Sequence, residues 1–162
     1  ADPRKRTDED VCCAISLIRQ FKEAGFSVQL GMNLKEAVSI ANLLYQENWA
    51  PGELVLEKLI RKLESAIKIN PIVVHPTDRA GCISNGIYEE VKGPYCSNPK
   101  FTTGAGDIFN SGFVYGQLQG KTYRESLLLG TAASGYYVRN GHSASTEELN
   151  EFINQWMMGK IN

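Results

Sequence analysis

The sequence has few of the residues that build metal centres and disulfide frameworks. It holds four cysteines, two of them adjacent at Cys12 and Cys13, and no Cys-x-x-Cys pair, which argues against a zinc knuckle or a disulfide framework. Its two histidines, His75 and His142, lie far apart and lack metal-ligand spacing with any carboxylate. We therefore expect His75, at the end of an apolar strand, to be structural.

The sequence also lacks a surplus of charge of either sign, and it lacks long apolar runs. The 17 lysines and arginines against 18 aspartates and glutamates give a formal net charge of −1, and Arg4–Arg6 is the one basic run. A chain with this charge is not expected to attract a nucleic-acid backbone or an anionic membrane electrostatically. The apolar runs are far too short to span a bilayer, and no signal peptide is visible. We expect a cytoplasmic protein that binds neither nucleic acid nor a membrane.

The composition that is present is ordinary for a globular protein. Hydrophobic residues make up 43% of the 162 residues and charged residues 22%, so residues 1–162 are expected to form a single domain. Helical spacing and capping residues predict helices from Thr7 to Gly25, Asn33 to Tyr45, 53–69, 105–118, 122–138 and 146–158. Strands are predicted over 26–30 and 71–75, and Asn85-Gly86 predicts a hairpin between 82–84 and 87–91. This order indicates an α/β sheet with parallel crossovers.

The most informative segment runs from Thr102 to Phe113. Two glycines, Gly104 and Gly106, flank Ala105, and Asp107 follows at once where an amphipathic helix begins. The free backbone N–H groups of such a helix start can hold a transferring phosphoryl group, while the carboxylate removes a proton from the attacking hydroxyl. The alternative is that the glycines only allow close helix packing, and that the aspartate only stabilises the helix N-terminus.

A second segment, Asn33-Leu34-Lys35-Glu36, follows a predicted strand and opens a helix. It is thus placed at the carboxyl edge of the sheet, where open α/β folds bind ligands. The same four residues form a capping box, in which Asn33 caps the helix and Glu36 reaches back. Both readings stay open, since a cap and a binding site can coexist.

Two other glycine patterns are weaker. Residues 116–122 imitate a phosphate-binding Walker A loop, but three residues instead of four separate the glycines, and a helix precedes them instead of a strand. Gly104-x-Gly106 could begin a dinucleotide-binding fingerprint, but Phe109 occupies the third glycine position.

Residues 102–113 closely resemble the C-terminal signature of the ribokinase-like (PfkB) family of carbohydrate and nucleoside kinases. The resemblance implies a three-layer α/β/α sandwich, with a mostly parallel sheet plus a hairpin. In that family the amides corresponding to Gly104, Ala105 and Gly106 form an anion hole, and the aspartate corresponding to Asp107 is the catalytic base. The family also carries an Asn-x-x-Glu motif, matched here by Asn33 and Glu36, that acts around Mg²⁺ and the phosphates.

The resemblance further implies a nucleotide site. Thr103 and Gly81 would contribute to it, and the loop containing Asn140 and Gly141 would line the adenine and a monovalent-cation site. Two departures bear on these roles. Phe101 stands where the family commonly has an aspartate, which leaves the monovalent cation uncertain, and the loop over 75–81 keeps only the final glycine of a Thr-x-Gly-x-x-Gly pattern.

The resemblance spans the whole chain, but only as the C-terminal half of such a kinase. We therefore expect a fragment of a longer protein, with an uncovered sheet edge that favours a homodimer or other self-association. The function expected is ATP- and Mg²⁺-dependent phosphoryl transfer to a sugar-like hydroxyl. A non-catalytic nucleotide-binding or assembly module and a nucleoside kinase of the same family are the alternatives.

Overall fold

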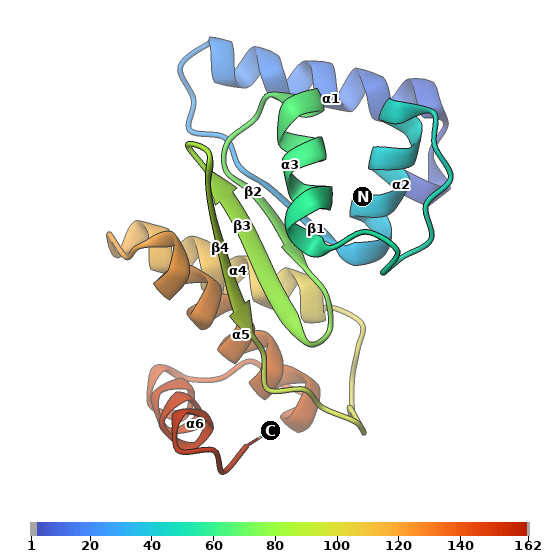
Figure 1. Cartoon of the computed structure of the whole chain (residues 1–162). Coiled ribbons are helices and arrows are strands. Elements are labelled where there is room, and N and C mark those ends of the chain that lie inside the picture. Colours follow the sequence, from blue (N-terminus) through green and yellow to red (C-terminus); the bar gives the residue numbers. More distant parts are fainter. Residues whose placement is uncertain (1–2, 162) are drawn as a thin grey trace. The chain divides into compact units, whose positions relative to one another are not determined.

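The computed structural model describes residues 3–161, which divide into two compact units. The first unit holds the residues up to Val74 together with Gly81–Tyr88. The second unit holds His75–Ala80 and the residues from Glu89 onward. The elements, labelled in Figure 1, are η1 Pro3–Lys5, α1 Asp8–Glu23, β1 Leu30–Asn33, α2 Leu34–Tyr45, α3 Leu56–Ile67, β2 Ile72–His75, β3 Arg79–Ser84, β4 Ile87–Lys92, α4 Ala105–Leu118, α5 Tyr123–Asn140 and α6 Thr146–Met157.

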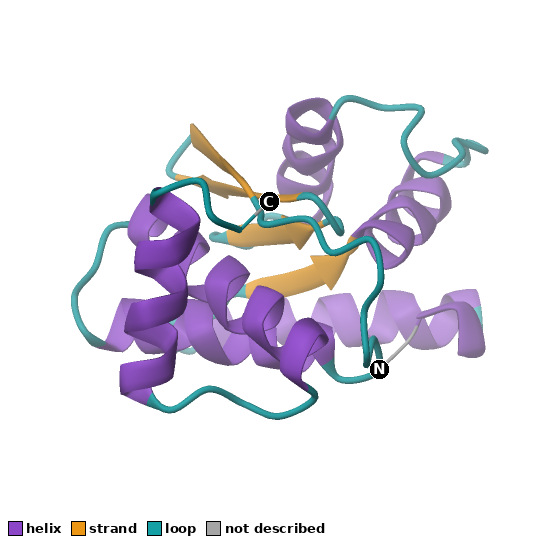
Figure 2. Cartoon of the chain, turned by 90° about the horizontal axis from the view of Figure 1, so that it is seen from below, coloured by secondary structure: helices purple, strands orange, loops and turns teal. Residues whose placement is uncertain are grey.

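The four strands form one sheet in the order β1-β2-β3-β4. Figure 2 shows the strands in orange. β2 runs antiparallel to β3, with Ile72 opposite Ile83 and Val74 opposite Gly81. A mostly parallel sheet plus a hairpin was predicted, and the pairing of β2 with β3 is a further antiparallel pair that the sequence did not indicate. The reason lies in the connections, since only residues 76–78 join β2 to β3 and a parallel pair needs a crossover of a dozen or more residues.

The core of the first unit lies between its helices and its strands. Arg19 of α1 holds the end of α3, because its Nε donates to the Ile67 carbonyl at 2.7 Å and its Nη2 to the Ala66 carbonyl at 2.6 Å. Most of the apolar side chains that α2, α3 and the strands contribute are almost fully removed from solvent, a burial of the kind that drives folding. They include Ala37, Val38, Ala41, Leu59, Ile60, Leu63, Ile67, Ile72, Val74 and Ile83.

In the second unit, glycines let α4 and α5 pack unusually close. A methyl group built on Gly112 would lie 2.8 Å from the Leu129 carbonyl oxygen, and one on Gly130 would lie 2.8 Å from the Phe109 carbonyl oxygen. Alanine at either position would push the two helices apart. The predicted alternative for glycines near 104–107, close helix packing, thus applies to glycines further along α4.

Several predicted boundaries are confirmed and one strand is misplaced. Helix α2 begins after Asn33 and α4 begins at Ala105, as predicted, and the hairpin turns at Asn85 and Gly86 with φ values of 50° and 78°. The strand predicted over 26–30 begins only at Leu30. Phe26 follows the end of α1 and packs back on it instead, because its N–H donates to the Phe21 carbonyl at 3.1 Å and its ring lies edge-on against the Phe21 ring at a centroid distance of 5.6 Å.

The lengths and apolar content of the helices bear on whether the chain could span a membrane. None of the helices between residues 3 and 161 is long and apolar enough to cross a lipid bilayer.

Candidate active site

Helix α4 starts with backbone donors for which the described part of the chain, residues 3–161, offers no acceptor. Gly104, its N-cap, takes the left-handed conformation at φ 85° and offers no side chain to cap the helix. The N–H of Ala105 donates to the Thr102 carbonyl at 3.2 Å, and that of Ile108 donates to the Gly104 carbonyl at 3.0 Å. Within residues 3–161, the N–H groups of Gly106 and Asp107 have no such partner. Two adjacent peptide N–H groups are therefore available to an anion.

Asp107 sits in this first turn with its side chain exposed. Its backbone carbonyl accepts a hydrogen bond from the Ser111 hydroxyl at 2.9 Å. A carboxylate beside two open N–H groups can accept a proton from an alcohol while the amides hold an anionic group.

The loop before α4 is fastened to the end of α5. The Tyr137 hydroxyl donates to the Thr103 carbonyl at 3.0 Å, and the Lys100 N–H donates to the Val138 carbonyl at 2.8 Å. Gly141 ends α5 in the left-handed region at φ 85°, and the Phe101 ring lies 2.9 Å from where its Cβ would be. The structure thus brings Thr103 and Gly104 near Gly141, all three predicted as site residues.

Asn140, the fourth predicted residue of this region, is exposed at the last position of α5. Its side-chain amide donates to the Tyr136 carbonyl at 3.0 Å, within its own helix. Tyr137 and Phe101 make the connection between the loop and α5, and no sequence pattern assigned them a part in it. The only available signal was that Phe101 replaces a polar residue of the resembled family.

His75 lies against the start of α4. Its ring stacks on Phe109 at a centroid distance of 4.5 Å and an interplanar angle of 27°. Burial lowers the pKa of His75 to about 4, while the nearby Asp107 charge acts in the opposite direction. The imidazole is therefore neutral at pH 7, which agrees with the structural role predicted for it.

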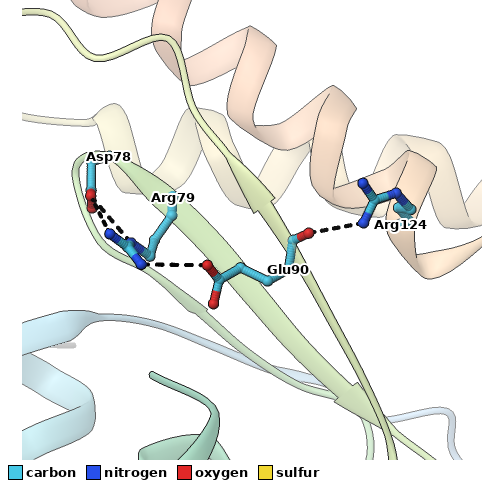
Figure 3. Close-up of polar contacts among 4 residues, drawn as sticks. All are labelled: Asp78, Arg79, Glu90 and Arg124. Atoms are coloured by element: carbon cyan, nitrogen blue, oxygen red, sulfur yellow. Dashed lines mark hydrogen bonds and ion pairs between the residues drawn. The ribbon is translucent and has the colours of Figure 1, made fainter. Parts of the chain in front are cut away.

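The turn after β2 is held by charged side chains instead of the glycine-rich pattern of the resembled family (Figure 3). Arg79 pairs with Asp78 at 2.8 Å and with Glu90 of β4 at 3.5 Å, and Arg124 donates to the Glu90 carbonyl at 2.9 Å. The hydrogen bond from Arg79 is the largest of the effects that lower the pKa of Asp78. The Asp78 carbonyl in turn accepts from the Gly93 N–H at 2.8 Å. The turn is therefore bonded to β4 through Glu90 and to the residue after β4 through Gly93.

The predicted site residues of the first unit are Asn33, Glu36 and Gly81. Asn33 and Glu36 form the capping box, with Asn33 Oδ1 accepting from the Glu36 N–H at 2.9 Å and Glu36 Oε2 accepting from the Asn33 N–H at 3.0 Å. Gly81 is buried in β3, where a Cβ would lie 2.8 Å from the Tyr88 hydroxyl. Packing alone accounts for this glycine.

The Asn33–Glu36 turn fits a magnesium ion held through water. The cap uses only one carboxylate oxygen of Glu36, so Oε1 is not committed to it. Mg²⁺ in nucleotide sites keeps several waters and binds one or two carboxylates plus phosphate oxygens, so a dedicated protein cage is not needed. Among residues 3–161 no group of three or more histidines, cysteines, aspartates or glutamates lies together as a cage.

Comparison with known proteins gives the family. The family model described as prokaryotic ketohexokinase matches residues 1–156. A curated ketohexokinase from Haloferax volcanii is 31% identical over 83 residues, which are 51% of this chain and 20% of that protein.

Solved structures give the fold. The ribokinase of Thermotoga maritima superposes with a TM-score of 0.66 at 22% identity, over 78% of this chain and 42% of that one. The Arabidopsis thaliana ribokinase, complexed with ribose and ATP, gives a TM-score of 0.63 at 17% identity, over 77% of this chain and 40% of that one. These likenesses confirm the predicted ribokinase-like fold. The chain spans less than half the length of each of these relatives.

Proposed function

Because the chain belongs to the prokaryotic ketohexokinase family, we propose that its protein transfers the terminal phosphoryl group of ATP to a hydroxyl of a ketohexose-like sugar. The observation that carries the proposal is the start of α4, where two unpaired N–H groups stand beside the exposed carboxylate of Asp107. A sugar acceptor follows from the family, and ATP is the nucleotide bound by the Arabidopsis ribokinase.

Asp107 acts as the general base in this proposal. It accepts the proton of the attacking hydroxyl as the oxygen–phosphorus bond forms and the bond to the leaving ADP oxygen breaks. The proposed anion hole is the run of backbone amides of Gly104, Ala105 and Gly106. Among residues 3–161 the Gly106 N–H has no acceptor in the protein, whereas the Ala105 N–H bonds the Thr102 carbonyl and would have to share or release that bond. Because phosphoryl transfer needs little covalent help, positioning and electrostatics supply most of the acceleration.

The remaining predicted residues have supporting roles. Asn33 and Glu36 would hold Mg²⁺ through water, and a bound ion would supply positive charge that offsets the negative charge of a nucleotide's phosphates. Thr103, Asn140 and Gly141 lie by the loop that leads into α4, which supports a role for them beside the nucleotide. Gly81 is left out, since its neighbours are Tyr88, Ile60 and Leu56.

Self-association through an outer strand is a further part of the proposal. β1 and β4 are the outer strands of the sheet between residues 3 and 161, and Ile87 at the start of β4 is 66% exposed. An outer strand offers unpaired backbone groups to a second copy. Sedimentation of the purified protein tests this, and a monomer at all concentrations would contradict it.

The proposed activity is tested with the full-length protein, Mg·ATP and a panel of ketoses, aldoses and nucleosides. We expect ADP release that depends on a ketohexose and on Mg²⁺. Calorimetry with Mg·ATP, with and without the sugars, separates this from a non-catalytic nucleotide-binding module. Tight nucleotide binding without turnover on any acceptor would favour the module.

A further inference from the structure

We propose that His75 is a positioning residue whose ring holds the first turn of α4, and with it Gly106 and Asp107, in place. The expected effect of His75 on catalysis rests on the proposed function. Its effect on the order of the first turn of α4 can be tested without any enzyme activity. His75 ends β2, and its ring lies against the helix that carries the proposed base.

The ring of His75 is the first of four in a continuous stack. Phe109 stacks on it at 4.5 Å, Phe113 follows Phe109 at 6.4 Å, and Tyr123 follows Phe113 at 6.4 Å between centroids. The two phenylalanines are four residues apart on α4 and are each only 2% exposed. We call these four rings the aromatic column. It supports α4 along one face, from its first turn to the start of α5.

Glycines fix the same helix where it meets α5. Methyl groups built on Gly112 and Gly116 would lie within 3 Å of α5 atoms, at 2.8 Å from the Leu129 carbonyl and 2.6 Å from the Ser126 hydroxyl. With α5 at contact distance and the aromatic column packed along it, α4 has little freedom to rotate or slide. His75 is the part of this arrangement that reaches the first turn.

The two glycines of the motif are needed for different reasons. Gly104 has φ 85°, a conformation that side chains with a Cβ rarely adopt. Gly106 has an ordinary helical backbone, but a methyl group there would lie 3.2 Å from His75 Cε1 and 3.7 Å from its Nε2. The edge of the imidazole therefore occupies the space that a side chain at 106 would take.

The protonation state of His75 suits this role. Its pKa of about 4 keeps the ring uncharged at neutral pH, mainly because the ring is buried. A neutral ring can be buried against Phe109 without the desolvation cost that a charged imidazole would carry. A hydrogen bond to its own backbone and the Asp107 charge act in the opposite direction and raise the pKa of His75, but burial has the larger effect.

The test compares His75→Ala, which removes the ring, with His75→Phe, which keeps the stack. In the full-length protein we expect His75→Ala to lower kcat about 10- to 100-fold with KM for ATP changed less than about twofold, because the base and anion hole lose their alignment. His75→Phe should restore kcat to within about threefold of wild type. Tyr123→Ala, at the far end of the aromatic column, is the matched control and should lower thermal stability with kcat nearly unchanged.

A double-mutant cycle adds a direct test of the contact. Gly106→Ala should reduce kcat in the wild-type background and cost clearly less in the His75→Ala background, where the ring no longer blocks the methyl group. Additive effects of the two substitutions would overturn the inference, as would wild-type kcat in His75→Ala.

Hydrogen exchange of the backbone tests the positioning role of His75 independently of the proposed kinase activity. The Ile108 N–H, which bonds Gly104 in the first turn, should exchange faster in His75→Ala and at the wild-type rate in His75→Phe. This holds whether or not a sugar is phosphorylated. If no substrate is turned over, the proposed function fails. If exchange of Ile108 does not respond to His75→Ala, the positioning role fails.

Discussion

Two helix starts in this chain, those of α2 and α4, show how the same position can be closed or left open. At α2, Asn33 and Glu36 satisfy each other's backbone N–H groups at 2.9 and 3.0 Å. At α4, Gly104 supplies no side chain, and within residues 3–161 the N–H groups of Gly106 and Asp107 find no acceptor. The first arrangement stabilises a helix, and the second leaves donors without a protein acceptor, which is what the proposed phosphate site requires.

The closed type is the common one in this molecule. Reciprocal capping boxes also begin three other helices, through Thr7 with Asp10, Thr122 with Glu125, and Ser145 with Glu148. Helix α3 lacks a side-chain cap as well, but its N-cap Val55 has φ −56° and no left-handed glycine precedes the helix. A left-handed glycine followed by an exposed aspartate distinguishes α4.

The largest effect is expected from Asp107→Asn, which removes the proposed base from the open start. We expect kcat of the full-length protein to fall by about two decades or more, with nearly unchanged affinity for Mg·ATP, because general-base catalysis contributes about 10²- to 10⁴-fold. Steady-state kinetics and calorimetry check this together. Turnover near the wild-type level would contradict the assignment.

Gly104→Ala should have the next largest effect. It tests whether the uncapped start of α4 requires a residue without a Cβ at position 104. We expect a loss of about 1–2 kcal/mol in the free energy of unfolding, because φ is 85° and a Cβ would lie 3.3 Å from the Tyr137 hydroxyl. Urea denaturation measures it. Gly25→Ala is the matched control, with φ 90° and nothing within 4 Å, so it carries the backbone strain without the crowding. An equal loss in the free energy of unfolding in both variants would contradict the added crowding at Gly104.

Asn33→Ala tests the closed start. We expect a loss of about 1 kcal/mol in the free energy of unfolding, because the cap acceptor for the Glu36 N–H disappears. Ser145→Ala removes the equivalent cap of α6 and is the control for stability alone. Glu36→Gln keeps a cap acceptor but loses its charge, so we expect it to raise the Mg²⁺ concentration needed for half-maximal activity. An unchanged Mg²⁺ requirement would leave Glu36 as a cap only.

The smallest effect near neutral pH concerns His75, which lies beside the open start. Its pKa is lowered in the folded protein to about 4 from an ordinary value of 6.5, so the unfolded chain binds the proton more readily. Folding stability should therefore fall as the pH drops from about 6.5 to about 4, and the contribution should level off below that. Chemical denaturation at several pH values checks this. His75→Phe is the control, because a phenylalanine has no group that titrates and so lacks the His75 contribution to the pH dependence. Identical pH profiles would contradict it.

Local chemistry accounts for what could be predicted from the sequence. The Asn33 cap, the Asn85-Gly86 turn and the start of α4 are set by residues within a few positions of each other, and the structure confirms all three. The strand predicted over 26–30 was misplaced, because an apolar run at a helix end gives the same signal as a short strand. Phe26 packs on Phe21 instead.

Tertiary neighbours account for what could not be predicted. Tyr137 is 34 residues from the Thr103 carbonyl that it binds. His75 reaches Phe109 and the Gly106 position only through the packing of α4. The crowding at position 106 is invisible in the sequence for the same reason, since the ring that causes it belongs to His75 at the end of β2, 31 residues earlier in the chain.

The central claim is that the open start of α4 holds the phosphoryl group of a nucleotide beside Asp107. The most direct measurement is a crystal structure of the full-length protein with a non-hydrolysable ATP analogue, Mg²⁺ and a ketohexose. We predict the terminal phosphate within hydrogen-bond distance of the Gly106 N–H, and a sugar hydroxyl facing an Asp107 carboxylate oxygen. A nucleotide whose terminal phosphate is bound away from residues 104–107 would contradict the account.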